Sequence, residues 1–503
     1  MKNIYLDEDD WRAKARWNSD GFFDLRTLDT GDCPVRLFLS PKLLAETEVT
    51  LYRQIVHATR FSGAKLVCLT PDAHHGFGVP VGCVILTDAR DGAIAMGPVG
   101  YDIGCGMISA RSNVPAHAAT HDRKLAFNRE VIERVPVGLS GGAGSYSAID
   151  KRQFLELAHG GVDSFRSMFD AEIDQSRMER GRLPVDDSWE VPWGGVGRPE
   201  RGIQQLGSLG GGNHFIELQS GVPDGHDPRD MREGHLFVQI HTGSRGFGHG
   251  LATNYFELAR RERPESNNID LGFFTPDSPH YRGYQNAVAA AGNFALINRA
   301  AIFWQVAAAF AKVFRADLEL VYEISHNLVQ RESHEDFGDV WVHRKGATRA
   351  FPARHPALKD TLFFDSGHPV LIPGSNRDES YILRPLQGAR RSAYSVNHGA
   401  GRRMSRGDAL RSLSQQKVNE QYREAKIVVN DDSDVPLDES ASCYKSSDEV
   451  ISTVVDAGLA RVEHRLWPLA SIKGTEQADG RKKRDRAKAG KARTLERKAN
   501  RRQ

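Results

Sequence analysis

The chain has 503 residues, of which 40% are hydrophobic, so it can form one large packed core or two or three smaller ones. Its formal net charge is +2, but residues 475–503 hold 12 Lys and Arg against 4 Asp and Glu, which leaves 55 basic and 61 acidic residues in 1–474. The slightly acidic main body excludes a uniformly basic nucleic-acid binder, so any polyanion must be met by local clusters.

The cysteine pattern, the N-terminus and the most apolar segment all favour a cytoplasmic protein without a membrane span. The five cysteines show no disulfide-like spacing and the N-terminus has no apolar signal core, so we expect a cytoplasmic protein. The most apolar long segment, residues 287–314, is interrupted by Asn293, Asn298 and Arg299, which argues against a membrane span. The tail, residues 475–503, is expected to be disordered, with salt-sensitive attraction to RNA as its functional alternative.

The first part of the chain predicts a helix followed by short strands. Residues 41–59 are amphipathic and predict one helix. A buried strand over 65–69 is expected to lead into a loop over 70–78 that contains Asp72, and a second strand covers 82–87. Functional groups in open sheets often follow strands in this way, so the loop is a candidate site.

A glycine-rich run over residues 97–107 carries Asp102 and Cys105 three residues apart. Glycine is costly inside helices and strands, so this run predicts sharply bending backbone. The carboxylate and the thiol could then face one point as two ligands of a metal ion. Most such spacings are accidental, and this one gains weight only from other donors.

Helices are expected over residues 115–172 and 284–315, with a charged surface insertion over about 174–203 between them. Three histidines lie at the ends of predicted strands: His214 begins one, and His241 and His326 follow two others. A single histidine so placed is more often a satisfied hydrogen-bonding group. Three of them, together with Asp102 and Cys105, form a set of good donors for a divalent metal ion.

Residues 395–406 are predicted to open a helix. Small residues there leave backbone N–H groups free for an anion, and Arg402 and Arg406 would lie four apart on one helix face, suited to phosphate contacts. His398 stands at the entrance. It is either a structural capping histidine or a nucleophile or acid–base group beside bound phosphate.

Most of these candidate residues fall in six short blocks of the sequence. The blocks are Asp102-Ile-Gly-Cys105-Gly-Met, Leu-Gly-Gly-Gly-Asn213-His214-Phe, His241-Thr-Gly-Ser-Arg245-Gly, His326-Asn327, Val-His343-Arg-Lys-Gly-Ala-Thr-Arg349-Ala and Asn397-His398-Gly-Ala-Gly-Arg402, and the resemblance that they carry spans residues from about 65 to 475. Together, and in this order, they resemble the signature blocks of the RtcB family. These are GTP- and manganese-dependent RNA ligases that join a 3′-phosphate or 2′,3′-cyclic phosphate end to a 5′-hydroxyl end. The resemblance implies a single large α+β domain over 1–474, with mixed and antiparallel sheets, surrounding helices and a central metal pocket.

The resemblance also implies roles for individual residues. Two Mn²⁺ ions would be bound by Asp102, Cys105, His214, His241 and His326, with Cys105 as the bridge. His398 would be guanylylated, with Asp72 and Arg245 as catalytic partners near the RNA ends. The guanine nucleotide would contact Asn213, Glu217, Ser375, Ala400, Gly401, Tyr444 and Lys473, and RNA or phosphate would contact Arg402 and Arg406.

Two features qualify the resemblance. A thiolate with three imidazoles favours zinc, iron or cobalt before manganese on ligand softness, so manganese rests on the resemblance alone. After Ser375, where the family has Met and small residues, this chain has Asn-Arg-Asp-Glu at 376–379, which puts the local nucleotide contacts in doubt.

The predicted function is an RNA ligase that acts through a covalent GMP–histidine intermediate and an activated RNA end, in RNA repair or tRNA splicing. The alternatives are a metal-dependent RNA hydrolase or nuclease and a catalytically inactive RNA-binding homologue. The expected partners are RNA ends and, as a further candidate, an archease-like activator. We expect a monomer.

Overall fold

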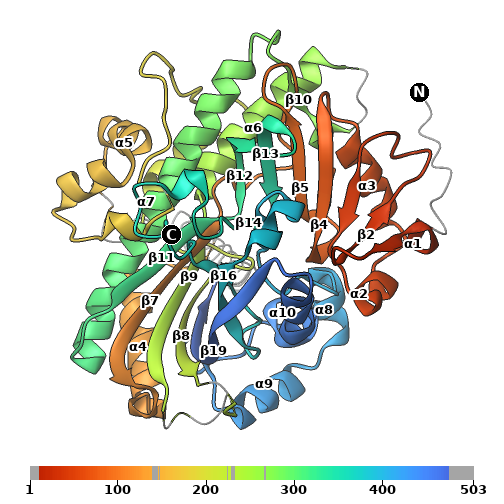
Figure 1. The fold of residues 1–503 in the computed structure, drawn as a ribbon. Coiled ribbons are helices and arrows are strands. Elements are labelled where there is room, and N and C mark those ends of the chain that lie inside the picture. The colour runs from red at the N-terminus through yellow and green to blue at the C-terminus, as the bar shows by residue number, and fades with distance from the viewer. Residues whose placement is uncertain are drawn as a thin grey trace, which may run out of the picture.

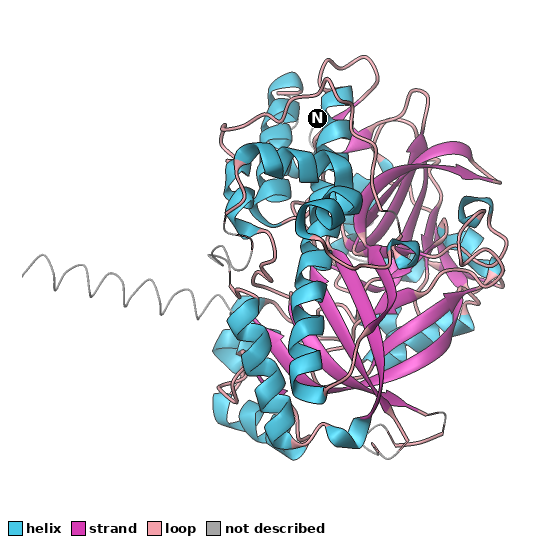
Figure 2. Ribbon diagram, turned by 90° about the vertical axis from the view of Figure 1, so that its left-hand side faces the viewer, coloured by secondary structure: helices cyan, strands magenta, loops and turns pink. Residues whose placement is uncertain are grey.

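Two large β-sheets lie side by side at the centre of the molecule, and helices pack around them (Figure 1). The structure is a computed structural model that describes residues 11–474, apart from 139–145, 147, 180, 224, 228–230, 232 and 265–267. Seen from the side, most helices gather on one side of the strands (Figure 2). The predicted tail over 475–503 lies outside the described residues.

The first sheet has seven strands, and only β3 and β4 run parallel. In sheet order its strands are β1 (Arg16–Asn18), β2 (Phe22–Leu25), β3 (Val35–Leu37), β4 (Ala64–His74), β5 (Val81–Asp88), β13 (Gly338–Lys345) and β12 (Asn327–His334). The central strands β4 and β5 are almost fully buried, as their near-continuous apolar sequence requires. The C-terminal end of β4 therefore delivers Asp72 to the interior.

The second sheet has eight strands: in order β11 (Glu319–Ser325), β7 (Gly106–Pro115), β9 (His235–Thr242), β8 (Phe215–Val222), β19 (Ala460–Lys473), β16 (Ser380–Pro385) and β15 (Val370–Ile372), with β18 (Val428–Val429) beside β19. Its first four strands are antiparallel, with Gly106 opposite Thr242 and Ser325, and Phe215 opposite His241. The starts of β7 and β8 and the ends of β9 and β11 therefore share one edge of the sheet. This register gathers the segments that carry Cys105, His214, His241 and His326 at that edge.

Helices and two small strand pairs complete the fold. The helices are α1 (Trp11–Lys14), α2 (Pro41–Glu46), α3 (Leu51–Thr59), α4 (His121–Arg134), α5 (Lys151–Phe169), α6 (Arg245–Glu262), α7 (Tyr281–Phe314), α8 (Arg406–Ser412), α9 (Gln415–Glu424) and α10 (Ser447–Asp456). The strand pairs are β6 (Ile94–Ala95) with β10 (Phe273–Phe274), and β14 (Ala347–Arg349) with β17 (Ser395–Asn397). The predicted α+β class with mixed and antiparallel sheets is confirmed.

The long helix α7 is a core helix. It is long and apolar enough to cross a membrane, but 72% of its most apolar stretch is buried inside the protein. Its polar residues bond to neighbouring segments: Asn293 accepts from the Leu183 N–H at 2.6 Å, and Asn298 accepts from the Gly207 N–H at 2.8 Å. These side chains therefore tie the helix to the loops around it.

Three local predictions were wrong. The single helix expected over 41–59 is two helices, because Thr47 adopts extended backbone after α2. The loop expected over 70–78 begins only after His74, since β4 continues through Asp72. The helix expected to open within 395–406 begins at Arg406, where Ser405 caps its N-terminus, and residues 398–405 form an irregular loop after β17.

The segment over 174–203, expected at the surface, is partly buried. Met178, Leu183 and Val191 belong to the main hydrophobic core, and the Glu179 carboxylate pairs with buried Arg349 at 2.8 Å. The segment is charged in composition, but its apolar side chains face the core. Whether the segment is an insertion in the domain stays a prediction.

Candidate active site and metal-ligand cluster

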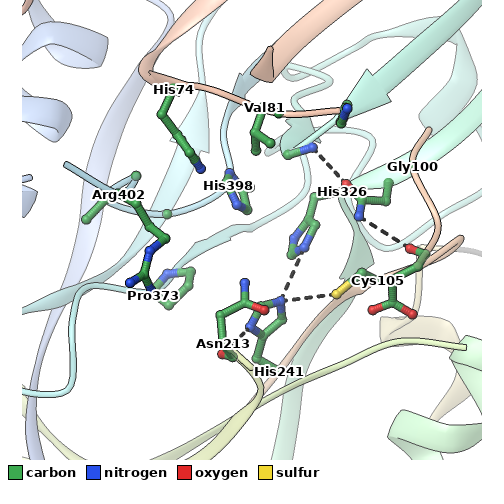
Figure 3. A pocket seen from close by; sticks show the side chains of 18 of the residues that line it. His74, Val81, Gly100, Cys105, Asn213, His241, His326, Pro373, His398 and Arg402 are labelled. Atoms are coloured by element: carbon green, nitrogen blue, oxygen red, sulfur yellow. Dashed lines mark hydrogen bonds between the residues drawn. The ribbon is translucent and has the colours of Figure 1, made fainter. Parts of the chain in front are cut away.

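A cavity of about 400 Å³ opens where the two sheets meet, and most of the predicted site residues line it (Figure 3). Loops after strands supply the walls, since irregular backbone lets side chains from both sheets reach one space. The predicted residues that line the cavity are Asp102, Cys105, Asn213, His241, His326, Ser375, His398, Ala400, Gly401, Arg402, Arg406, Tyr444 and Lys473. Asp72, His214, Glu217 and Arg245 lie behind its walls.

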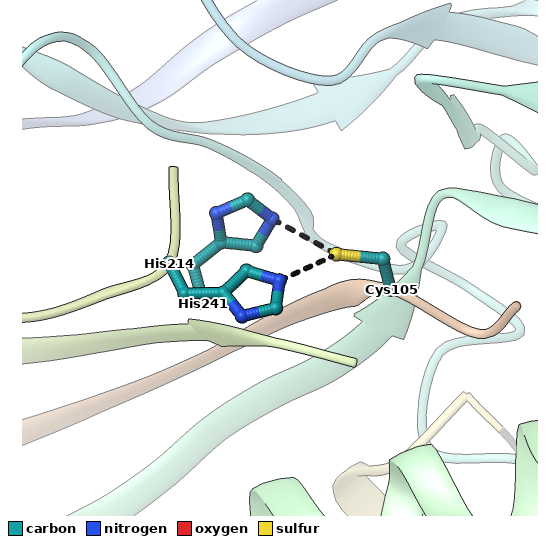
Figure 4. A group of neighbouring side chains, drawn as sticks. All are labelled: Cys105, His214 and His241. Atoms are coloured by element: carbon teal, nitrogen blue, oxygen red, sulfur yellow. Dashed lines mark hydrogen bonds between the residues drawn. The ribbon is translucent and has the colours of Figure 1, made fainter. Parts of the chain in front are cut away.

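The five residues predicted as metal ligands lie together at the shared edge of the second sheet. Cys105 Sγ lies 3.5 Å from His214 Nε2 and 3.3 Å from His241 Nε2 (Figure 4). His214 Nε2 lies 3.1 Å from Asp102 Oδ2, and the Nε2 atoms of His241 and His326 lie 3.3 Å apart. Among the described residues, Cys105, His214 and His241 are the group whose donor atoms all lie within 4.8 Å of one another. Carboxylate, thiol and imidazole donors at such spacing fit a divalent cation.

The outer nitrogens of two imidazoles are already engaged. Leu209 O lies 2.9 Å from His214 Nδ1, and Asn213 O lies 3.1 Å from His241 Nδ1. A carbonyl can only accept, so each Nδ1 carries a proton. Burial keeps the His241 ring neutral, so its Nε2 presents a lone pair to the sulfur, whereas the Nε2 of His214 faces both the sulfur and the Asp102 carboxylate. Backbone carbonyls that fix the tautomer in this way are typical of metal-binding histidines.

The electrostatics of the cluster agree with this role. Burial raises the pKa of the Cys105 thiol well above its usual value, and the Asp102 carboxylate adds to the rise. Burial lowers the pKa of His241 and of His326 well below the ordinary value, so both rings are neutral. For Asp102, burial acts to raise the pKa, but His214 outweighs it and lowers the pKa to about 2. A bound cation would stabilise the Cys105 thiolate, whose formation burial and Asp102 both oppose in the ligand-free site.

Arg299 of α7 ties three ligand-bearing segments together. Its Nη1 donates to Gly104 O at 2.6 Å and to Thr242 O at 2.9 Å, and its Nη2 donates to Ser325 Oγ at 2.9 Å. These three residues are the direct neighbours of Cys105, His241 and His326. The guanidinium is completely buried and pairs with the equally buried Glu323, whose Oε1 accepts from Nε at 2.7 Å. One cation thus fixes the spacing of the cluster.

His398 lines the cavity beside His326 and is paired with a buried carboxylate. Its Nδ1 lies 2.6 Å from Asp72 Oδ2, which also accepts from the His398 backbone N–H at 3.2 Å. Burial acts to raise the pKa of Asp72, but the charge and hydrogen bond of His398 outweigh it and lower that pKa. An ionised carboxylate only accepts, so Nδ1 holds the proton and Nε2 is the free nitrogen. The His398 and His326 rings lie 4.9 Å apart, facing the same space.

The loop after His398 packs tightly on β4. Gly401 has a φ of +76°, and a Cβ there would meet Asp72 O at 2.2 Å, so only glycine fits. Lys445 holds the same strand from the other side, donating to Pro71 O at 3.2 Å and Ala73 O at 2.7 Å. The β4 backbone at Asp72 is therefore held in place by Gly401 and by the Lys445 side chain.

The basic side of the cavity is organised by Glu439, which the sequence did not single out. Its buried carboxylate accepts from Arg402 at 3.3 Å and Arg406 at 3.2 Å and lies 3.7 Å from Lys473 Nζ. The Tyr444 hydroxyl donates to it as well. Burial acts to raise the pKa of Glu439, but Lys473 and the two arginines lower it overall. The two arginines thus converge through Glu439 and not through a shared helix face.

The remaining predicted residues are distributed around these groups. Ser375 lines the cavity and donates to Asp378 Oδ2 at 2.6 Å. Asp378 is one of the residues at 376–379 that differ from the family pattern, so this difference acts directly on Ser375. Glu217 is buried on β8, where burial raises its pKa to about 7 although Lys473 acts to lower it. Arg245, at the start of α6, donates to Ser208 Oγ at 3.2 Å and to Gly138 O at 3.1 Å, behind the metal-ligand cluster. A catalytic role for Arg245 stays a prediction.

Four side chains at or beside the site were missed by the sequence reasoning: Arg299, Glu439, His74 and Lys345. Lys345 and His74 both line the cavity. His74 lies in the predicted loop over 70–78 and Lys345 in one of the six sequence blocks, and the glycines near each were an available signal. Glu439 sits in an acidic stretch typical of solvated loops, and Arg299 sits in an apolar helix. A charged residue in an apolar segment was the available signal for Arg299, and no local pattern distinguishes Glu439.

Comparisons with known proteins agree over most of the chain. A family model described as "tRNA-splicing ligase RtcB" matches residues 54–474. The "tRNA-splicing ligase RtcB" of Thermococcus kodakarensis is 34% identical over 437 residues, covering 82% of this chain and 88% of that protein. That of Pyrobaculum aerophilum is 34% identical over 88% of this chain and 95% of its own length. The "RNA-splicing ligase RtcB" of Mycobacterium bovis is 34% identical over 84% of this chain and its whole length.

Proposed function

The chain belongs to the RtcB family, and from this premise we propose that it is a GTP-dependent RNA ligase acting in tRNA splicing or RNA repair. It joins a 3′-phosphate or 2′,3′-cyclic phosphate end to a 5′-hydroxyl end, and water first opens a cyclic end. The observation that carries this proposal is the 2.6 Å pairing of His398 with buried Asp72, beside the Cys and His cluster in one cavity.

His398 is the nucleophile that takes up GMP. Because Asp72 engages Nδ1, the Nε2 lone pair is free to attack the α-phosphorus of GTP, and pyrophosphate leaves. The carboxylate fixes the ring and its tautomer and stabilises the positive charge that forms on the imidazole. Asp72 thereby supports the covalent bond between Nε2 and phosphorus.

The guanylate then passes to RNA. An oxygen of the RNA 3′-phosphate attacks the phosphorus of the GMP–histidine, which frees His398 and leaves an RNA end activated by GMP. The 5′-hydroxyl oxygen attacks the RNA phosphorus, GMP leaves, and a phosphodiester forms. Arg402 and Arg406, which Glu439 holds at one side of the cavity, would contact the phosphates, and Arg245 would act near the RNA ends.

The Cys and His cluster would hold the metal. Asp102, Cys105, His214, His241 and His326 would bind two Mn²⁺ ions, which supply charge neutralisation at phosphoryl oxygens when bound. The guanine nucleotide would lie between Asn213, Ser375, Ala400, Gly401, Tyr444 and Lys473, with Glu217 behind. We further propose that the ligase domain covers 1–474, that the tail adds RNA attraction, and that the protein is a cytoplasmic monomer served by an archease-like activator.

A labelling experiment tests the proposal. The protein is incubated with α-phosphate-labelled GTP and Mn²⁺ and then denatured. Wild-type protein is expected to retain the label, and His398→Ala is expected to retain none, because no other group would form the covalent bond. His121→Ala replaces an exposed histidine on α4 and should label like the wild type.

The opposite result identifies a different enzyme. RNA cleavage that needs the metal but neither GTP nor His398 would indicate a nuclease that uses the same cluster. RNA binding without labelling, ligation or cleavage would indicate an inactive homologue. Either outcome overturns the proposed function.

A further inference from the structure

Phe77 holds an exposed aromatic ring at the mouth of the cavity. Its side chain is 69% exposed, yet it lines the same cavity as His398 and Cys105. Single exposed apolar side chains are common on protein surfaces and need no special explanation. The position of this ring and the way its backbone is held therefore carry the inference.

Hydrogen bonds hold the backbone on both sides of Phe77. Gln54 of α3 bonds both ways to Gly76: its Nε2 donates to the Gly76 carbonyl, and its Oε1 accepts from the Gly76 N–H at 3.0 Å. The Phe77 carbonyl accepts from buried Lys345 at 2.6 Å, and the Gly78 carbonyl lies 3.0 Å from His57 Nδ1. Side chains from two other elements thus fix a turn whose central ring faces solvent.

The two glycines make this turn possible. Gly78 has a φ of +73°, a conformation that other residues rarely adopt. A Cβ at Gly76 would meet Val79 O at 2.6 Å. The ring is therefore presented by a turn of defined shape, which lowers the entropic cost of binding a partner on it.

Tyr101 supports the Phe77 ring, and its own ring faces are covered by His249 and Phe256 of α6. Its ring packs edge-on against Phe77, with centroids 6.2 Å apart and planes at 90°, and it lines the cavity too. The Tyr101 hydroxyl donates to Asp270 at 3.1 Å, and the ring stacks on His249 with centroids 5.2 Å apart. Figure 3 places Gly100, the neighbour of Tyr101, on the other side of His326 from Arg402. The cavity thus has a cationic side and an aromatic side.

We propose that the Phe77 ring, supported by Tyr101, forms a stacking surface for the nucleobase at a reacting RNA end, an inference that rests on the proposed function. Phosphates match the cationic side, where Glu439 gathers Arg402, Arg406 and Lys473. The base of the same end needs a π face and no particular hydrogen-bond pattern, because a ligase of broken RNA meets every base. An aromatic ring provides this sequence-tolerant contact.

Binding of short RNAs tests the proposal without any ligation. The probes are 5′-labelled or 3′-labelled ten-nucleotide RNAs that expose either a 3′-phosphate or a 5′-hydroxyl end, with adenine or an abasic site at the terminal nucleotide. Fluorescence anisotropy gives Kd in Mn²⁺ without GTP. Phe77→Leu is expected to weaken binding of the adenine-ended RNA about tenfold at one of the two ends, and of its abasic counterpart less than about twofold.

Two further variants control the comparison. Phe77→Trp keeps a stacking ring and should retain the preference for the adenine end over the abasic end. Trp17→Leu removes another exposed aromatic ring, 58% exposed and away from the cavity, and should change neither Kd. If Phe77→Leu is poorly folded, Tyr101→Leu is measured in the same way.

The outcomes separate this inference from the proposed function. Equal weakening of adenine-ended and abasic RNA, or no weakening at either end, overturns the stacking surface even when ligation is intact. In that case the exposed ring serves a protein partner or none. A wild-type protein that binds RNA with the expected base dependence but takes no label from GTP contradicts the proposed function and leaves the stacking surface in place.

Discussion

The metal-ligand side of the cavity is assembled from strand ends of one sheet, whereas the basic side is assembled from loops and one buried carboxylate. On the first side, antiparallel register alone places Cys105, His214, His241 and His326 at a common edge. On the second, Arg402 and Tyr444 lie in irregular segments far apart in the sequence, and they contact each other and share hydrogen bonds to Glu439. The same cavity thus combines a site fixed by topology with a site fixed by electrostatics.

Each side is organised around one buried charged side chain. Arg299 binds carbonyls and a hydroxyl beside three ligands, and Glu439 binds two guanidinium groups and an ammonium. The first arrangement leaves the donor atoms free for a cation. The second leaves a surplus of positive charge for an anion. The difference predicts that the two sides respond differently to mutation and to ligands.

The largest expected effect follows from Arg299→Met. It leaves the Glu323 carboxylate buried without its partner, so we expect a loss of about 3–5 kcal/mol in the free energy of unfolding, measured by chemical denaturation. The folded fraction should also bind Co²⁺ at least about tenfold more weakly, because second-layer contacts orient metal ligands. Titration of the thiolate-to-cobalt absorption band measures that affinity.

Arg344→Met provides the matched control. Arg344 is also buried and pairs with Glu332 through both Nη atoms, but its other contacts are with Ser395, Ala393 and Tyr394. It should lose similar stability and keep the cobalt affinity. If both variants lose cobalt binding equally, Arg299 has a general structural role and the contrast between the two sides weakens.

The sequence could predict the first side better than the second, for a physical reason. Metal ligands need particular side-chain types next to turns, and both leave local signals, as at Cys105 and His214. A buried carboxylate such as Glu439 has no local signal, because its partners come from other segments. The same reason explains why the helix expected at 395–406 was wrong: Arg402 and Arg406 are brought together by a distant charge and not by helical spacing.

The fold was also predicted where the signal is local and missed where it depends on distant segments. Strong apolar patterns predicted the strands over 65–69 and 82–87 and the helix over 284–315. The first strand continues five residues past its predicted end, and the other two differ by one to three residues at their ends. Sheet order was not predicted, because β12 and β13 join the first sheet only after the chain has formed four of the eight strands of the second. The core contacts of Met178 and Leu183 were hidden by the charged residues around them.

Glu217 stands between the two sides and predicts a pH effect. Its pKa is about 7 in the folded protein against 4.5 for the free side chain. Between these values the folded state holds a proton that the unfolded state has released, so stability falls as pH rises from 4.5 to 7 and stays low above that. Glu217→Gln should remove this decline and stabilise the ligand-free protein above pH 7 by on the order of 3 kcal/mol.

Denaturation curves at several pH values between 5 and 8 measure this effect. Glu319→Gln replaces a half-exposed carboxylate on the same sheet and should leave the wild-type pH dependence unchanged. If stability depends on pH in the same way in Glu217→Gln as in the wild type, the buried carboxylate is ionised over the whole range and is stabilised by Lys473. Glu217 would then belong with the residues of the basic side.

The smallest expected effect concerns Glu439→Gln, which keeps the size of the side chain and removes its charge. Arg402, Arg406 and Lys473 then repel one another without a counter-charge, so we expect a loss of about 2 kcal/mol in stability. Phosphates can replace the missing charge, so GTP should raise the melting temperature of the variant more than that of the wild type. Asp408→Asn, which breaks the exposed pair with Arg411, should change neither quantity. A variant that GTP stabilises less than the wild type would show that Glu439 orients the cations for the nucleotide, and that geometry outweighs net charge on this side as it does on the other.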